Sequence, residues 1–283
     1  MVRTVLFTLF VALALVGAGV DADNAVDEND VEQTSVVDRY PDIAAAYAVA
    51  VDGKLQWAGN PDVPRQPASL AKLLSALVLL ESGWNPEALV TVSAAAAGIE
   101  GSRVGLRRGE QLRAADLLTG MLVRSGNDAC LALAEHAAGS VAAFAKLMNQ
   151  RAARLGMKNS NFVQPCGLDA TGQHTTARDL LLLAEAARGA QEVRSRAAMT
   201  DAVIHTASGR EIRFNNTNAL IGRSPEINGL KSGYTSGAGN CVIALGERDG
   251  HYAIVVLLGS PNRWWKTTGL IAQALGPVAP PRY

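Results

Sequence analysis

The sequence predicts an α+β fold, in which strands from both ends of the chain form one antiparallel sheet and the segments between them form a helical lobe. Two observations support this prediction. Runs with strand character lie at residues 43–57 and again after residue 227. Between them, residues 70–188 are rich in Ala and Leu at helical spacing. A cleft between the sheet and the helical lobe would be the natural place for a ligand.

The expected elements follow in order along the chain. Asp52-Gly53 is a strong two-residue turn signal and predicts a hairpin between the runs 43–51 and 54–57. Thr176 has the side chain of an N-cap and should begin a helix. The predicted helices cover 70–81, 114–124, 128–138, 141–155, 176–188 and 264–275, and the later strands cover 227–235, 240–247 and 252–259.

The composition is that of a globular chain with a sizeable core. Of its 283 residues, 48% are hydrophobic and 18% are charged, and the formal net charge is zero. No long basic block occurs, so nothing predicts a surface for polyanions. We therefore expect no nucleic-acid partner.

The first 22 residues have the pattern of a signal peptide. Arg3 precedes an apolar segment at 4–20, and the small residues up to Ala22 suit signal peptidase. The apolar segment is shorter than the roughly 20 residues that a membrane-spanning helix needs, so an uncleaved anchor is the weaker alternative. We expect export to the periplasm or cell-wall space.

Three further segments complete the domain organisation. Residues 23–38 are acidic and contain no basic residue, and we expect a disordered leader there. The folded domain should cover 39–276, starting near Tyr40. The Pro-rich segment 277–283 should be a loose tail.

The cysteines and histidines form no metal motif. Cys130, Cys166 and Cys241 leave an odd thiol in an oxidising compartment, so at most one intramolecular disulfide can form, and the sequence leaves its partners open. Neither a Cys-x-x-Cys pair nor a His-Glu-x-x-His spacing occurs. We expect neither a metal nor another cofactor.

The first predicted helix contains an isolated charge. Lys72 is the only charged residue between Arg65 and Glu81, and Ser69 lies three residues before it. Residues three apart share a helix face, about 5 to 6 Å apart at Cβ, so the amine can reach the hydroxyl. Burial would lower the pKa of Lys72 and let it take the Ser69 proton. Alternatively, Lys72 extends to the surface and Ser69 caps the helix.

Two more short motifs carry polar residues. Ser125-Gly126-Asn127 opens the helix at 128–138, where its alternative role is that of a capping loop. Lys231-Ser232-Gly233 lies on a predicted strand, where the lysine could instead guard an exposed edge. With the first motif they give the order S-x-x-K, S-x-N, K-[ST]-G, separated by 56 and 106 residues. This order is typical of penicillin-binding proteins and class A β-lactamases.

The sequence resembles the low-molecular-mass penicillin-binding proteins, the serine D-alanyl-D-alanine carboxypeptidases and their endopeptidase relatives. The resemblance runs from about Tyr40 to Leu275 and includes the contexts R-R-G-E-Q-L-R-A-A-D-L-L, L-G-M-K-N-S-N-F-V and G-L-D-A-T-G-Q-H-T-T-A-R-D-L. It implies a serine DD-peptidase/β-lactamase-like fold, with an antiparallel sheet flanked by helices, a helical lobe and the active site in the cleft between them.

The resemblance implies catalytic roles for the first two motifs. Ser69 would be the nucleophile and Lys72 its general base, while Ser125 would relay a proton toward the leaving amine. Asn127 would orient Lys72 and the substrate amide. The backbone N–H groups of Ser69 and Tyr234 would form the oxyanion hole.

The third motif would bind the substrate. By the resemblance, Lys231 supplies positive charge for the proton relay and for the substrate carboxylate, Thr235 contacts the terminal carboxylate, and Arg263 assists. The residues expected to bind substrate are Asn127, Lys231, Ser232, Gly233, Tyr234 and Thr235.

The implied reaction is two-step acyl transfer. Ser69 attacks the peptide carbonyl of D-Ala-D-Ala in a peptidoglycan stem peptide, the terminal D-alanine leaves, and water hydrolyses the acyl-enzyme. A β-lactam antibiotic would acylate the same serine as a covalent inhibitor.

The motifs leave the branch of the family open. Ser232 stands where Thr is more frequent in the family, and Cys166 stands where His is more usual. Tyr234-Thr235 followed by A-G-N-C-V is more similar to the endopeptidases, which cut cross-links, whereas S-G-N-D-A-C is more similar to the carboxypeptidases. The C-terminal β-domain and membrane-anchoring helix of many carboxypeptidases are expected to be missing, which would leave a soluble exported enzyme.

Other classes fit the sequence less well. A class A β-lactamase needs a glutamate to activate the deacylating water, and none lies between Glu135 and Glu185. A non-catalytic wall-binding module would not need every motif side chain, and all are present. A Ser-His-Asp hydrolase of the α/β type would carry a G-x-S-x-G elbow, which is absent.

Overall fold

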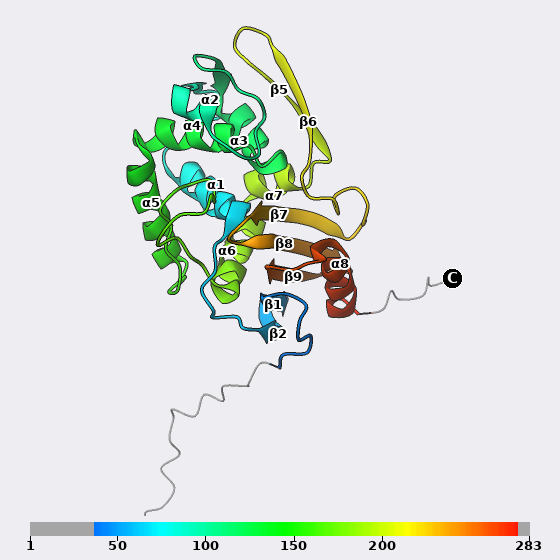
Figure 1. Ribbon diagram of the computed structural model, residues 1–283. Helices are drawn as coiled ribbons and strands as arrows, with labels where there is room; N and C mark the ends of the chain where they lie inside the picture. The colour runs from blue at the N-terminus through cyan, green and yellow to red at the C-terminus, as the bar shows by residue number, and fades with distance from the viewer. Residues whose placement is uncertain (1–36, 277–283) are drawn as a thin grey trace, which may run out of the picture. The chain divides into compact units, whose positions relative to one another are not determined.

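The computed structural model describes residues 37–276 (Figure 1). The predicted signal peptide, nearly all of the acidic leader and the Pro-rich tail lie outside the described residues.

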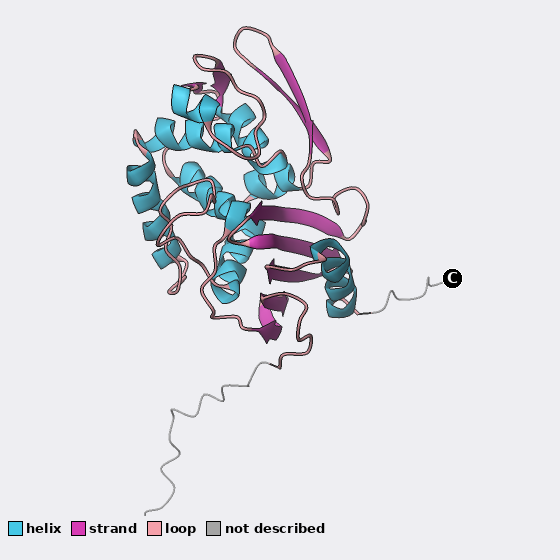
Figure 2. Ribbon diagram, viewed as in Figure 1, coloured by secondary structure: helices cyan, strands magenta, loops and turns pink. Residues whose placement is uncertain are grey.

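Five strands form one antiparallel sheet with the order β2-β1-β9-β8-β7 (Figure 2). The N-terminal hairpin pairs through β1 with β9, more than 200 residues later in the chain for Ala46 and Leu258. The prediction that both ends of the chain share one sheet is therefore confirmed. The strands are β1 (Ala46–Val51), β2 (Lys54–Gly59), β7 (Ile227–Thr235), β8 (Gly239–Arg248) and β9 (His251–Leu258).

Both faces of the sheet are covered by helices, so the buried middle parts of its central strands are apolar. Alternate residues of β1, β8 and β9 point to opposite faces, as strand geometry requires. One face, with Val49 and Val255, packs against Leu270 and Ile271 of α8 (Arg263–Ala274). The opposite face packs against the helical lobe through α6 (Ala177–Gly189) and α1 (Ala71–Glu81).

The predicted helices are present, and each end lies within one residue of its predicted position. Thr176 caps α6, since its hydroxyl accepts from the Asp179 N–H. Helix α1 is buried along almost its whole length and lies inside the lobe, which explains its apolar sequence (Figure 1). A 3₁₀ turn, η1 (Ala68–Leu70), precedes it, and α3 (Ala114–Val123), α4 (Asn127–Ala138) and α5 (Val141–Arg154) complete the predicted helices of the lobe.

Six short elements were not predicted. Strands of three residues and helices of five to seven residues carry too few apolar positions to show a period. The hairpin at 201–215 alternates exposed and buried residues in its second strand, and it extends from the lobe (Figure 1). The six elements are β3 (Leu89–Thr91), α2 (Ala94–Gly98), β4 (Gln111–Arg113), α7 (Gln191–Ala197), β5 (Asp201–His205) and β6 (Glu211–Asn215).

Within residues 37–276, no single helix is both long and apolar enough to cross a membrane. Helices α4 and α5, which meet at 87°, reach the required length and apolarity only as a bent pair.

Candidate active site

A cavity of about 360 Å³ lies where strand β7 meets the helical lobe, and it gathers most of the predicted site residues. Its volume is in the range of small-molecule sites. Residues from all three sequence motifs, far apart in the chain, line the same space. The lining residues are Ser69, Gly101, Ser102, Ser125, Asn127, Gly167, Leu168, Thr217, Ser232, Gly233, Tyr234, Thr235 and Arg263.

The backbone of Ser69 is held between two glycines. A Cβ on Gly233 of β7 would lie 2.7 Å from the Ser69 nitrogen, and a Cβ on Gly167 would lie 1.8 Å from the Ala68 oxygen. Ala68 has a φ of 49°, a conformation that non-glycine residues rarely adopt outside functional sites. This close packing brings the N–H of Ser69 next to strand β7, which carries the other expected oxyanion donor, Tyr234.

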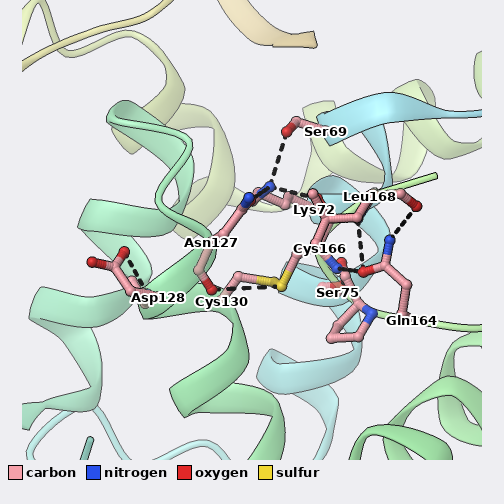
Figure 3. Close-up of a disulfide and its surroundings, with 12 residues drawn as sticks. Ser69, Lys72, Ser75, Asn127, Asp128, Cys130, Gln164, Cys166 and Leu168 are labelled. Atoms are coloured by element: carbon pink, nitrogen blue, oxygen red, sulfur yellow. Dashed lines mark hydrogen bonds between the residues drawn. A yellow bond between two sulfur atoms is a disulfide. The ribbon is translucent and has the colours of Figure 1, made fainter. Parts of the chain in front are cut away.

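Lys72 is fully buried and points its amine at Ser69 (Figure 3). Its Nζ lies 2.9 Å from the Ser69 Oγ, and it donates to the Asn127 Oδ1 at 2.7 Å and to the backbone carbonyl of Cys166. The alternative in which Lys72 reaches the surface is therefore wrong. Ser69 makes no capping hydrogen bond either, because α1 begins after Leu70 without a side-chain cap.

The surroundings of Lys72 favour a neutral amine. Burial lowers its pKa well below the ordinary value, the nearby Lys231 charge lowers the pKa further, and Asp128 opposes these effects by raising it. A neutral amine has two N–H groups and one lone pair. The Asn127 Oδ1 and the Cys166 carbonyl can only accept, so they take both hydrogens and leave the lone pair for the Ser69 hydroxyl.

Ser125 and Asn127 reach the cavity from the turn between α3 and α4. Ser125 is 5% exposed and has a φ of 60°, so its backbone is also in the sparsely populated left-handed region. Asn127 is the first residue of α4, and its Nδ2 donates to the Glu100 carbonyl at 2.7 Å. Its amide oxygen therefore faces Lys72, and its amide nitrogen is directed to the loop that borders the cavity.

Lys231 lies inside the protein on β7 and does not line the cavity. It is 1% exposed, and its Nζ donates to the Ser232 carbonyl at 2.9 Å. The alternative of a lysine guarding an exposed edge is therefore wrong. Burial, with a smaller effect from the charge of Arg263, lowers the pKa of Lys231 to about 7.

Arg263, the first residue of α8, supplies a second positive charge and does line the cavity. Its guanidinium donates to the Gly233 carbonyl at 2.7 Å and to the Asn240 Oδ1 at 2.9 Å. Burial lowers its pKa, yet a guanidinium stays charged at neutral pH. Arg263 thus holds β7 through the Gly233 carbonyl and places a positive charge at the edge of the cavity.

Two aspartates that the sequence did not single out shape the cavity. The buried Asp128 accepts from the backbone N–H groups of residues 104–106 and so holds the loop that contributes Gly101 and Ser102. Asp169 accepts from the Thr235 hydroxyl at 2.6 Å and from the Gly237 N–H at 2.8 Å. Thr235, expected to meet a substrate carboxylate, therefore already has a carboxylate beside it.

Thr217 was also missed. It lines the cavity with its hydroxyl 3.4 Å from that of Ser232. No local motif marks Thr217 in the sequence, whereas Asp128 directly follows the S-x-N motif and Asp169 belongs to the quoted G-L-D context.

One disulfide joins Cys130 to Cys166, and Cys241 is a buried free thiol. This settles the pairing that the sequence left open. Among residues 37–276, no group of three or more His, Cys, Asp or Glu side chains is arranged to hold a metal ion.

Comparison with known proteins agrees with this geometry. The family model for D-alanyl-D-alanine carboxypeptidases, peptidase family S11, matches residues 32–262. The chain is 37% identical over 234 residues to the D-alanyl-D-alanine carboxypeptidase DacC of Escherichia coli, covering 78% of this chain and 58% of that protein. It is 32% identical over 209 residues to the D-alanyl-D-alanine endopeptidase of E. coli, covering 72% and 67%.

The fold has a solved counterpart in the DD-transpeptidase of Streptomyces K15. The TM-score is 0.78 at 25% identity, and the match covers 84% of this chain and 99% of the transpeptidase. By contrast, the chain spans only 54% to 60% of the length of the carboxypeptidases DacF of Bacillus subtilis and DacD and DacC of E. coli. The family model matches most of the chain, and the chain therefore belongs to the D-alanyl-D-alanine carboxypeptidase family, the low-molecular-mass penicillin-binding proteins of peptidase family S11.

Proposed function

We propose that the protein is a serine-type D-Ala-D-Ala carboxypeptidase that acts on peptidoglycan stem peptides through an acyl-enzyme on Ser69. The observation that carries the proposal is the buried contact between the Lys72 amine and the Ser69 hydroxyl, 2.9 Å apart. Burial and two pure acceptors make this amine a base whose lone pair faces the nucleophile.

In the acylation step, Lys72 takes the Ser69 proton as the Oγ attacks the carbonyl between the two D-alanines. The oxyanion that forms would lie between the N–H groups of Ser69 and Tyr234, where each donor contributes roughly 3 to 4 kcal/mol to transition-state stabilisation. Ser125 then gives its hydroxyl proton to the leaving amine and regains one from Lys72, which returns to the neutral form as the C–N bond breaks. Water completes the cycle by hydrolysing the ester.

The substrate carboxylate would bind at the cationic end of the cavity. Arg263 lines the cavity, and Lys231 is buried on β7 beside it, so both positive charges favour an anion there. Ser232 offers a hydroxyl donor, whereas the hydroxyl proton of Thr235 is already donated to Asp169 and would have to turn toward the substrate. This arrangement supports cleavage next to a free C-terminal carboxylate, which is the carboxypeptidase reaction, and the carboxylate of a β-lactam would use the same donors.

The alternative function is that of an endopeptidase that cuts D-alanyl cross-links. The similarity to the E. coli endopeptidase favours it, because the chain covers more of that protein, 67%, than of the carboxypeptidases compared above. In a cross-link, the amide follows a D-alanine but leads into a side chain of a second peptide. The two substrates therefore test how strictly the cavity requires the terminal carboxylate.

The first experiment is intact-protein mass after incubation with benzylpenicillin, with Ser69→Ala beside the wild type. A stable adduct on the wild type alone is expected. Loss of the drug without an adduct would favour a β-lactamase, and intact drug without an adduct would favour a non-catalytic binding module. Release of free D-alanine from a pentapeptide, measured beside cleavage of a purified cross-linked dimer, then separates the two peptidase activities.

We also propose that the enzyme acts in the periplasm or cell-wall space. The apolar N-terminal segment supports export, and the Cys130–Cys166 disulfide is of the kind that persists in oxidising compartments. Cell fractionation with an antibody to the protein tests this proposal, and recovery in the cytoplasm with both cysteines reduced would contradict it.

A further inference from the structure

The disulfide lies directly beneath the catalytic lysine and joins the two segments that supply its acceptors (Figure 3). Cys130 is on α4, three residues after Asn127, so the two side chains share a helix face. Cys166 belongs to the irregular segment 164–168, and its own carbonyl accepts from the Lys72 amine. Both cysteines are 1% exposed. The covalent bond therefore fixes one acceptor of Lys72 relative to the other.

The segment that carries this carbonyl has no helix or strand to hold it. Ser75 donates to the Pro165 carbonyl at 2.7 Å, and the Gln164 side chain accepts from the N–H groups of Cys166 and Gly167. These contacts hold the neighbours of the Cys166 carbonyl, and Gln164 itself belongs to the segment. The disulfide is the covalent connection between Cys166 and the rigid lobe.

The packing around Gly167 restricts the direction in which the segment can move. The glycine lies so close to Ala68 that an added Cβ would be 1.8 Å from the Ala68 oxygen. No room remains toward the nucleophile. Without the disulfide, the segment can relax only away from Ser69 and Lys72, which lengthens the contact between the Cys166 carbonyl and the Lys72 amine.

We propose that the Cys130–Cys166 disulfide is a positioning element of the active site, which holds the Cys166 carbonyl against Lys72 and so keeps the lone pair of the base directed at Ser69. The inference rests on the proposed function, because it concerns the rate of the same acyl transfer. When the carbonyl withdraws, one N–H of the neutral amine loses its acceptor, and the amine can rotate about its Cε–Nζ bond.

Withdrawal of the segment would also open space for water beside Lys72. Burial is the largest cause of its low pKa, so hydration moves the pKa upward and reduces the fraction of neutral base at pH 7. A general base typically contributes 10² to 10⁴ in rate, so partial misplacement should cost at least about tenfold in acylation.

The test compares the full chain with Cys130→Ala/Cys166→Ala, which keeps the backbone carbonyl and removes only the covalent link. The readout is the second-order rate constant for acylation by a fluorescent penicillin between pH 5 and 10. We expect labelling of Ser69 to persist, with a rate constant at least about tenfold lower. The rise of the rate constant on the acidic side of its pH profile should move to higher pH. Cys241→Ala, which removes a buried thiol and keeps the disulfide, should retain the wild-type rate and profile.

Reduction of the folded wild type provides an independent measurement if the double variant fails to fold. Dithiothreitol transfers two electrons and two protons to the disulfide, giving two thiols and the cyclic oxidised reagent, and mass after alkylation counts the thiols. The reduced protein should acylate as slowly as the double variant and recover on reoxidation. A wild-type rate and pH profile in either folded form without the disulfide would overturn the inference, whereas an unlabelled wild type would overturn the proposed function itself.

Discussion

Asp128 allows a direct test of how the helical lobe holds the loop beside the cavity. Its two carboxylate oxygens accept from four backbone N–H groups, those of Val104, Gly105, Leu106 and Ala129, at 2.9 to 3.1 Å. Each oxygen serves two of them. Asp128→Asn keeps the shape of the side chain but turns one oxygen into an NH₂ group, so either orientation leaves two N–H groups without an acceptor.

The expected loss of stability follows from these two hydrogen bonds. A hydrogen bond to a charged group contributes about 1.5 to 3 kcal/mol, so two of them give a loss of at least about 3 kcal/mol in the free energy of unfolding. For a domain of this size, each kcal/mol lowers Tm by roughly 2 to 4 °C, which predicts a fall of roughly 6 to 12 °C. Acylation by penicillin should also slow, because the loop supplies Gly101 and Ser102 to the cavity.

Thermal and urea unfolding measured by circular dichroism check this prediction. Asp62→Asn is the matched control, since Asp62 makes an exposed pair with Arg178 and its loss should cost no more than about 1 kcal/mol. A Tm within about 2 °C of the wild type for Asp128→Asn, with normal acylation, would refute the reasoning, because the loop would then be held by other contacts.

Three more predictions concern strand β7 and its partners. Gly233→Ala places a Cβ 2.7 Å from the Ser69 nitrogen and should abolish penicillin labelling, whereas Gly189→Ala, with open space around it, should label normally. Because the pKa of Lys231 is about 7, its positive charge is present below that pH and is lost above it. The affinity for ligands that carry a carboxylate should therefore fall as the pH rises through 7. An unchanged Kd from about pH 6 to 9 would contradict this prediction. Asp169→Asn removes a negative charge beside Thr235, where the substrate carboxylate should bind, and should lower KM for the pentapeptide several-fold with little change in kcat, as steady-state kinetics would measure.

The sequence predicted the parts of the site that consist of side chains in local motifs. Ser69 and Lys72 are three residues apart, and the other two motifs are also short, so their chemistry is visible without the fold. The long helices and strands were predicted for the same reason, since each shows its own apolar pattern. The hairpin at 201–215 could have been found from the alternation in E-I-R-F-N.

The remaining parts of the site depend on tertiary contacts that no local pattern encodes. The Cys166 group that contacts Lys72 is a backbone carbonyl, which every residue possesses, so no residue type marks it. Asp128 accepts hydrogen bonds from backbone N–H groups more than 20 residues earlier in the chain. Asp169 accepts from the Thr235 hydroxyl only once the lobe and the sheet are packed together. The disulfide pairing likewise follows from the fold, since three cysteines allow three pairs.

The pairing of β1 with β9 determines when the proposed catalytic centre can form during folding. Ala46 meets Leu258 in the middle of the sheet, so the first strand has no partner on that side until almost the whole domain has been synthesised. Ser69, the proposed nucleophile, lies early in the sequence, but β7, the strand that packs against it, begins only at Ile227. Contacts between residues so far apart in the sequence form slowly during folding. Ser69 therefore reaches its position against β7 only when the last strands are in place, and the proposed activity should appear only with the completed domain.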